Sequence, residues 1–67
     1  MQRRMRERDL IIITDNNDGK YLQIGQIIEI QNYPHSDDVD YYRVQFANEI
    51  REYRYLENIC KVLMAER

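Results

Sequence analysis

The sequence predicts an all-β fold, a small and strongly bent barrel of five strands with a short 3-10 turn before the last strand. Residues typical of strands outnumber those typical of helices, since Ile, Val, Thr, Tyr and Phe occupy 20 positions and Ala, Leu and Met occupy 9. Apolar residues alternate with polar ones in several segments, and turn-forming residues separate these segments. A chain of 67 residues is long enough for one domain with one core.

The first two strands are predicted from residues 10–14 and 21–31. Residues 10–14 are mainly aliphatic, and the turn-forming residues 15–19 end the run. Residues 21–31 alternate, which is typical of a half-buried strand, and Gly25 is expected to mark a bend or bulge there. Ile27 is expected on the outer face of this strand. The pattern places these side chains on the inner face: Leu22, Ile24, Ile28 and Ile30.

A third strand is predicted at residues 41–46, after a polar loop at residues 32–40 that contains the single proline. Its pattern turns Tyr42, Val44 and Phe46 inward. The three residues that follow are few enough for a hairpin turn, in which Asn48 is the best candidate for a left-handed backbone conformation.

Residues 50–55 are predicted to form the return strand, with Tyr53 and Tyr55 facing the neighbouring strands. Leu56 and Ile59 are three residues apart, which is the spacing of a 3-10 turn. Residues 60–64 then supply the last strand, and residues 65–67 are expected to fray.

The charges divide the chain into parts. The formal net charge is −2, but residues 1–8 carry +3 and residues 9–48 carry −5. We therefore expect a basic, flexible N-terminal arm at residues 1–8 and a single domain at residues 9–64. Met1 and Met5 give the arm little to bury.

The cellular compartment is inferred from the cysteine and from hydropathy. A single cysteine cannot form an intramolecular disulfide, which favours a reducing compartment. The longest uninterrupted apolar run is Leu10 to Ile13, so neither a signal peptide nor a membrane span is expected. We expect a cytoplasmic protein that does not bind membranes.

The order of elements resembles the SH3-like barrels, especially their Tudor-like branch. The resemblance covers about residues 9–63, and the chain is also similar to small uncharacterised bacterial proteins. The segments that carry it are Asp18-Gly19 with Tyr21, Ile27-Ile28-Glu29-Ile30, Tyr42-Arg43-Val44-Gln45-Phe46, Glu52-Tyr53-Arg54-Tyr55 and Leu56-Glu57-Asn58-Ile59. The resemblance implies a five-stranded SH3-like barrel, a fold that serves many unrelated functions.

Tudor domains commonly bind methylated lysine or arginine in an aromatic cage. Only Tyr21 and Phe46 match cage positions by residue type, whereas Asp15, Glu49 and Arg51 stand near the others. The cage is therefore incomplete, methyl-ligand binding is not transferred to this chain, and Phe46 is expected in the core.

Catalysis, cofactors and metals are not expected. His35 is the single histidine, so the acidic residues near it are interpreted as a solvated loop and not as a metal site. Cys60 is expected to be an apolar filler on the last strand, and no glycine-rich phosphate loop is present. These observations favour a chain that is not an enzyme and needs no cofactor.

The tyrosines predict a non-catalytic protein-interaction module. Tyrosine offers contact area and a polar tip at low entropic cost. We expect Tyr42, Tyr53 and Tyr55 to lie partly in the core. The expected partner is another protein, whose identity the sequence does not give. The residues expected to contact it are Tyr21, Tyr33 and Tyr41.

Two alternatives remain open at this stage. In the first, the chain binds nucleic acid through arginines of the arm: Arg3, Arg4, Arg6 and Arg8. In the second, the chain forms homo-oligomers because residues 10–13 lie on an exposed edge strand. The other arginines are expected to pair across strands with Glu29, Glu49 or Glu52; they are Arg43, Arg51 and Arg54.

Overall fold

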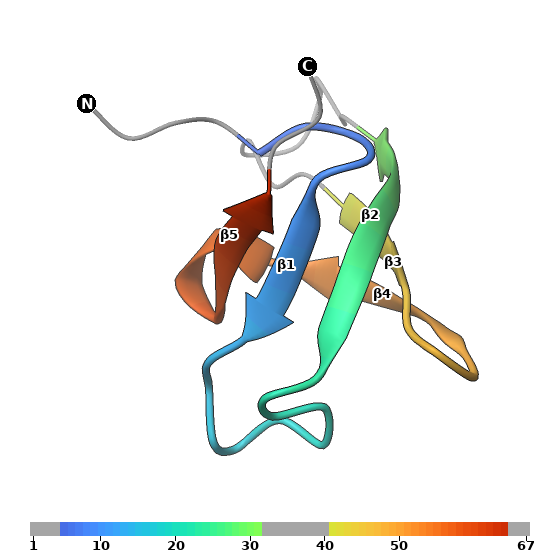
Figure 1. Cartoon of the computed structure of the whole chain (residues 1–67). Helices are drawn as coiled ribbons and strands as arrows, with labels where there is room; N and C mark the ends of the chain where they lie inside the picture. Colours follow the sequence, from blue (N-terminus) through green and yellow to red (C-terminus); the bar gives the residue numbers. More distant parts are fainter. Residues whose placement is uncertain (1–4, 32–40, 65–67) are drawn as a thin grey trace.

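A computed structural model describes residues 5–31 and 41–64 (Figure 1). It confirms the all-β fold: its elements in chain order are β1 (Leu10–Ile13), β2 (Ile24–Gln31), β3 (Tyr41–Gln45), β4 (Ile50–Arg54), the 3-10 helix η1 (Leu56–Asn58) and β5 (Cys60–Met64). The predicted loop at residues 32–40, with His35 and Tyr33, lies outside the described residues, as do residues 1–4 and the tail.

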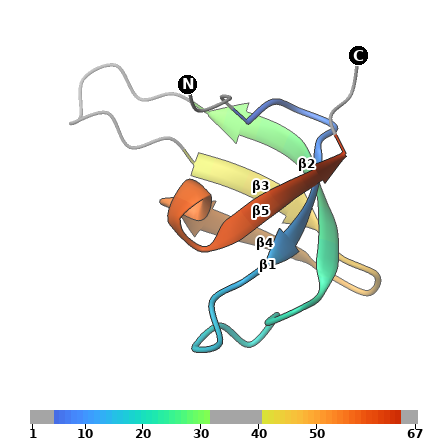
Figure 2. The same cartoon turned by 60° about the vertical axis from the view of Figure 1, so that its left-hand side comes forward.

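The strands form one antiparallel sheet in the order β4-β3-β2-β1-β5. The long strand β2 curves over the core, so that β1 and β5 lie on one side and β3 and β4 on the other (Figure 2). β4 and β5 are the two edges of the sheet, and the described residues do not join them into a closed barrel. β1 lies between β2 and β5, so the prediction of an edge strand at Leu10–Ile13 is wrong.

The core fills the space between the two sides of the bent sheet. Alternation along β3 turns Tyr42 and Val44 inward, and Phe46 follows on the same face, as predicted. Phe46 and Tyr53 meet edge to face, with 6.3 Å between ring centroids. The buried apolar residues are Met5, Ile11, Ile13, Ile27, Tyr42, Val44, Phe46, Tyr53 and Leu56.

The predicted faces of β2 are inverted at its first half. Ile27, expected outside, is fully buried, whereas Leu22 and Ile24, expected inside, are exposed. The faces are inverted because Gly25 occupies an inward-facing position of the strand. A Cβ at this position would lie 2.5 Å from Val44 Cγ1 and 3.0 Å from Phe46 Cε1. Gly25 is therefore a place of close approach and not the predicted bend or bulge.

The bulge in β2 lies three residues later. Ile27 is paired with Val44 and Glu29 with Arg43, so Ile28 is the extra residue and its side chain is exposed. The extra residue shifts the alternation by one position, and Ile30 consequently returns to the inner face, where it is half-buried against the core.

Two expectations for the β3–β4 hairpin are wrong. Asn48 does not adopt a positive φ; the non-glycine residues with positive φ are Arg8, Leu22 and Tyr55 among those described. Tyr55 takes the left-handed conformation, at φ 56°, because it leads from β4 into η1. This conformation turns the Tyr55 side chain out to solvent instead of toward the sheet, whereas Tyr53 is buried as expected.

The N-terminal segment has more to bury than its sequence indicates. Met5 is part of the core, and the Cys60 thiol donates to the Met5 sulfur at 3.6 Å. Asp9 is fully buried, and its carboxylate accepts a hydrogen bond from the Arg6 backbone N–H. The backbone N–H of Arg8 also donates to Ile27 at 2.6 Å, so the expectation of an arm with little to bury is wrong from Met5 onward.

We predict that Gly25→Ala lowers the free energy of unfolding by about 1–3 kcal/mol, because the added methyl group collides with two buried side chains. For a domain of this size the loss corresponds to about 5 °C or more in Tm, measurable by circular dichroism. Gly19→Ala is the matched control, since the nearest atom to its added Cβ is the flexible end of Arg51 at 3.8 Å. Equal Tm values for the two variants would contradict the assigned role of Gly25.

Candidate binding surface

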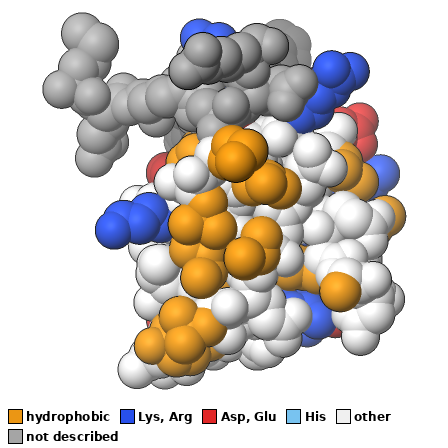
Figure 3. All heavy atoms as spheres, viewed as in Figure 1, with side chains coloured by type: hydrophobic (Ala, Val, Ile, Leu, Met, Phe, Trp, Pro, Cys, Tyr) orange, Lys and Arg blue, Asp and Glu red, His pale blue; other side chains and the backbone are white. Residues whose placement is uncertain are grey.

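The outer surface of β5, β1 and β2 is unusually apolar. Across this surface Ile12 is paired with Ile24 and Leu10 with Met64, and Leu63 occupies a bulge beside Met64. Figure 3 shows hydrophobic side chains gathered in a stripe on this side of the molecule. We call this stripe the apolar face; its residues are Leu10, Ile12, Tyr21, Leu22, Ile24, Leu63 and Met64.

Two polar side chains lie among the strand residues of the apolar face. Lys61 is paired with Ile12, and Gln26 is paired with Leu10. The Gln26 side-chain amide donates a 3.3 Å hydrogen bond to the Arg8 backbone carbonyl. Neither residue is a carboxylate, so the charge that the strands contribute to this face is positive.

Leu22 is held in an unfavourable backbone conformation. Its φ is 65°, in the left-handed region that costs an L-residue roughly 1–2 kcal/mol. The Leu22 backbone N–H donates to the Ile13 carbonyl at 2.8 Å, and this bond fixes the turn. The side chain nevertheless remains exposed, so local strain presents a leucine to solvent without adding it to the core.

A cluster of charges holds the loop that carries Tyr21 and Leu22. Asp18 accepts hydrogen bonds from the Lys20 backbone N–H and the Tyr53 hydroxyl, at 2.8 and 3.3 Å. The buried Lys20 ammonium lies 2.5 Å from Glu49 and 5.3 Å from the Phe46 ring centroid. These contacts join the loop to the β3–β4 hairpin.

Two side chains of this cluster have shifted pKa values, namely Glu49 and Tyr53. The hydrogen bond from Lys20 lowers the pKa of Glu49 below its ordinary value of 4.5, and Arg51, 3.5 Å away, acts in the same direction. Burial raises the pKa of Tyr53 above 10.0. Glu49 is therefore ionised, and Tyr53 protonated, at neutral pH.

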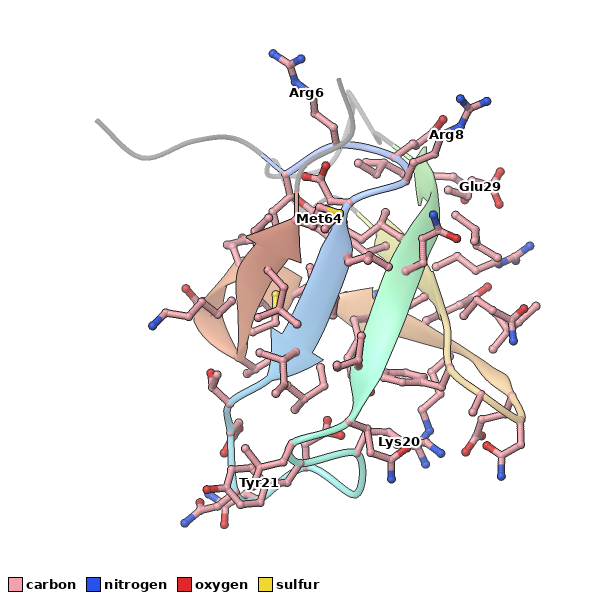
Figure 4. The ribbon with its side chains drawn as sticks, in the orientation of Figure 1. Arg6, Arg8, Lys20, Tyr21, Glu29 and Met64 are labelled. Carbon is pink, nitrogen blue, oxygen red and sulfur yellow. The ribbon has the colours of Figure 1, made fainter. Side chains whose placement is uncertain are left out.

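The structure does not bring the predicted tyrosines together. Tyr21 is exposed in the loop before β2, on the apolar face (Figure 4). Tyr41 is paired with Gln31 at the other end of β2, which is a strand of 8 residues, and the Arg54 guanidinium lies 4.6 Å from its ring centroid. Tyr33 lies outside the described residues. Tyr21 is thus the one predicted contact residue that the structure places on the apolar face.

The structure confirms only part of the predicted pairing between arginines and glutamates. Arg43 pairs with Glu52 at 2.7 Å and with Glu29 at 3.3 Å, as expected. Arg51 contacts Glu49, which is two residues earlier on the same arm of the hairpin and not across a strand pair as expected, and Arg54 donates to the Tyr41 hydroxyl instead of pairing with a glutamate.

The arginines assigned to nucleic acid lie partly outside the described residues. Arg6 and Arg8 are exposed and lie beyond Met64 in Figure 4, whereas Arg3 and Arg4 are not described. Nucleic-acid binding stays a prediction.

Cys60 lies on β5 and is half-buried beside Met5. Burial raises the pKa of its thiol from 9.0 to about 11, and Glu57 acts in the same direction. The thiolate is therefore scarce at neutral pH, which matches the structural role expected for this residue. Within residues 5–31 and 41–64, no group of three or more histidine, cysteine or carboxylate side chains is arranged to hold a metal ion.

Comparisons with known proteins return no match: no family model, curated protein or solved structure is significantly similar to this chain. Within the described ranges, no helix is long and apolar enough to cross a membrane.

The sequence pattern missed most of the apolar face. Alternation predicts Leu22 and Ile24 on the inner face, and for Leu63 and Met64 it predicts a strand without assigning a face. The sequence does contain a signal, because adjacent apolar residues such as 12–13, 27–28 and 62–64 must occupy both faces of a strand.

We predict that Glu49→Gln lowers Tm at pH 7, because it leaves the buried Lys20 ammonium without its counter-ion. The folded-state pKa of Glu49 is lowered, so its contribution to stability is present above pH 4.5 and is lost as the pH falls through that lowered pKa. The difference in Tm between wild type and variant should therefore shrink toward zero in acid. Thermal unfolding from neutral to acidic pH measures this difference.

Glu57→Gln is the matched control, since Glu57 is exposed and makes no ion pair with another described residue. A pH-independent difference between Glu49→Gln and wild type would contradict the proposed ion pair.

Proposed function

We propose that this chain is a non-catalytic module that binds another protein in the cytoplasm, and that the apolar face is its binding surface. One observation carries the proposal: four aliphatic side chains on this surface are half exposed or more, namely Leu22 at 59%, Ile24 at 55%, Leu63 at 50% and Met64 at 64%. Contiguous apolar surface of this kind is typical of interaction sites, because its exposure to water is unfavourable.

The fold proposed for this module is an SH3-like barrel. Its support is the strand order β4-β3-β2-β1-β5, the strong curvature of β2 and the 3-10 turn immediately before the last strand. This proposal places β1 at the centre of the outer face, between β5 and the first half of β2.

The chemistry of the apolar face favours a protein partner. Its side chains are mainly aliphatic, and Tyr21 is its one aromatic residue. Aliphatic side chains pack well against other aliphatic and aromatic side chains but do not provide the stacking platforms that single-stranded nucleic acid uses.

We predict that Leu22→Asn raises Tm by a few degrees and weakens partner binding. Asparagine tolerates a positive φ better than leucine, so the substitution relieves part of the backbone strain, worth about 0.5–1 kcal/mol. The lost leucine side chain is exposed and contributes little to the core. Thermal unfolding and a binding assay, run on the same preparations, measure the two effects. A fall in Tm would show that Leu22 serves the fold.

We also predict that substitutions on the apolar face abolish the capture of partner proteins. Three forms of the chain serve as baits for proteins in cytoplasmic extract: the wild type, a double variant and a control variant. The double variant Ile24→Thr/Leu63→Thr keeps strand-compatible side chains and removes apolar contact area from the apolar face. Ile50→Thr is the matched control, because Ile50 is 51% exposed but lies on the edge strand β4. Quantitative mass spectrometry should show partners retained by wild type and by Ile50→Thr and lost by the double variant. Equal retention by all three baits would contradict the proposed surface.

A further inference from the structure

We propose that the partner segment bound by the apolar face is acidic as well as apolar, that is, a stretch of protein in which leucine-like side chains alternate or cluster with aspartate or glutamate. This inference rests on the proposed function and adds the charge of the partner. It follows from how the described charges are distributed over the molecule.

Four of the described carboxylates pair with cations away from the apolar face. Glu29 and Glu52 both contact Arg43, on the side of β2 that pairs with β3. Asp18 and Glu49 contact Arg51 near the turn of the β3–β4 hairpin, 3.9 and 3.5 Å away. Arg43, Arg51 and Lys20, which contacts Glu49, offset most of these four negative charges locally.

The cations near the apolar face are not neutralised in the same way. Lys61 projects from the face itself, opposite Ile12. Arg6 and Arg8 extend beyond Met64 at one end of the face (Figure 4). No ion pair joins any of these three side chains to another described residue. A net charge of −2 therefore conceals an apolar surface with a positive border.

This arrangement selects among the possible occupants. A second copy that presented the same face would offer Lys61 apolar, amide and cationic side chains from its strands but no carboxylate. Lipid acyl chains would satisfy the aliphatic side chains but would leave Lys61, which lies within the face, without an acceptor. A protein segment supplies apolar side chains, carboxylates and backbone carbonyls at the same depth.

The test begins with a random peptide library selected on the wild-type chain and, in parallel, on Ile24→Thr/Leu63→Thr. Peptides enriched on wild type alone should combine large apolar residues with aspartate or glutamate. The best peptide is then synthesised as selected and with its carboxylates replaced by amides. Binding of both forms is measured by fluorescence anisotropy, at about 50 mM and about 500 mM NaCl.

Substitutions at Lys61 test the charge separately from the apolar contacts. Lys61→Glu should weaken binding of the acidic peptide about tenfold, because attraction is replaced by repulsion. Lys61→Arg keeps the charge and should bind as wild type does. The amidated peptide should bind more weakly than the acidic one and respond little to Lys61→Glu or to salt.

The outcomes separate the two proposals. Enriched peptides that are neutral or basic, and that bind Lys61→Glu as well as wild type, would overturn the acidic partner while leaving the apolar face as the binding surface. Peptides that bind Ile24→Thr/Leu63→Thr undiminished, or no enrichment over that variant, would overturn both.

Vesicles of phosphatidylglycerol and phosphatidylcholine and sedimentation equilibrium complete the test. Binding to vesicles, or dimerisation, that the double variant loses would assign the face to a membrane or to a second copy instead.

Discussion

The packing of Val44 and Phe46 against the bare backbone of Gly25 is the constraint on which the rest of the structure depends. The two side chains fill the space that a Cβ at Gly25 would need, so this part of β2 must turn Gly25 and Ile27 inward. Strict alternation then forces Ile24 outward, opposite Ile12. The exposed isoleucines are thus a direct consequence of how the core is filled, and the apolar face begins there.

The loop before β2 extends the same surface by a different mechanism. Lys20 and Asp18 bind it to the β3–β4 hairpin, and the Ile13 carbonyl fixes the backbone N–H of Leu22. Held at both ends, Leu22 adopts a positive φ and directs its side chain to solvent. A strained backbone that exposes a leucine is unfavourable for folding by itself, which is why we connect it with binding.

Charge is distributed unevenly over the two sides of the bent sheet. On the side of β3 and β4, Arg43 and Arg51 form ion pairs with four carboxylates. On the side of β1 and β5, Lys61 stands among aliphatic side chains. The ion pairs of Arg43 and Arg51 lie at the surface and contribute little to stability. Their position nevertheless decides where unpaired charge remains. Electrostatic complementarity of this sort governs partner choice more than affinity.

The sequence by itself determined the strands, the 3-10 turn and the inward residues of β3, because period-two alternation and turn-forming residues act over a few neighbouring positions. It also determined the cross-strand pairing of Arg43 with two glutamates. It did not determine the faces of β2, since isoleucine occurs on both of them and the choice depends on Phe46, which is 21 positions beyond Gly25 in the chain. The burial of Met5 and the assembly of the apolar face from three strands were likewise decided by tertiary packing, because only the folded sheet places β5 beside β1.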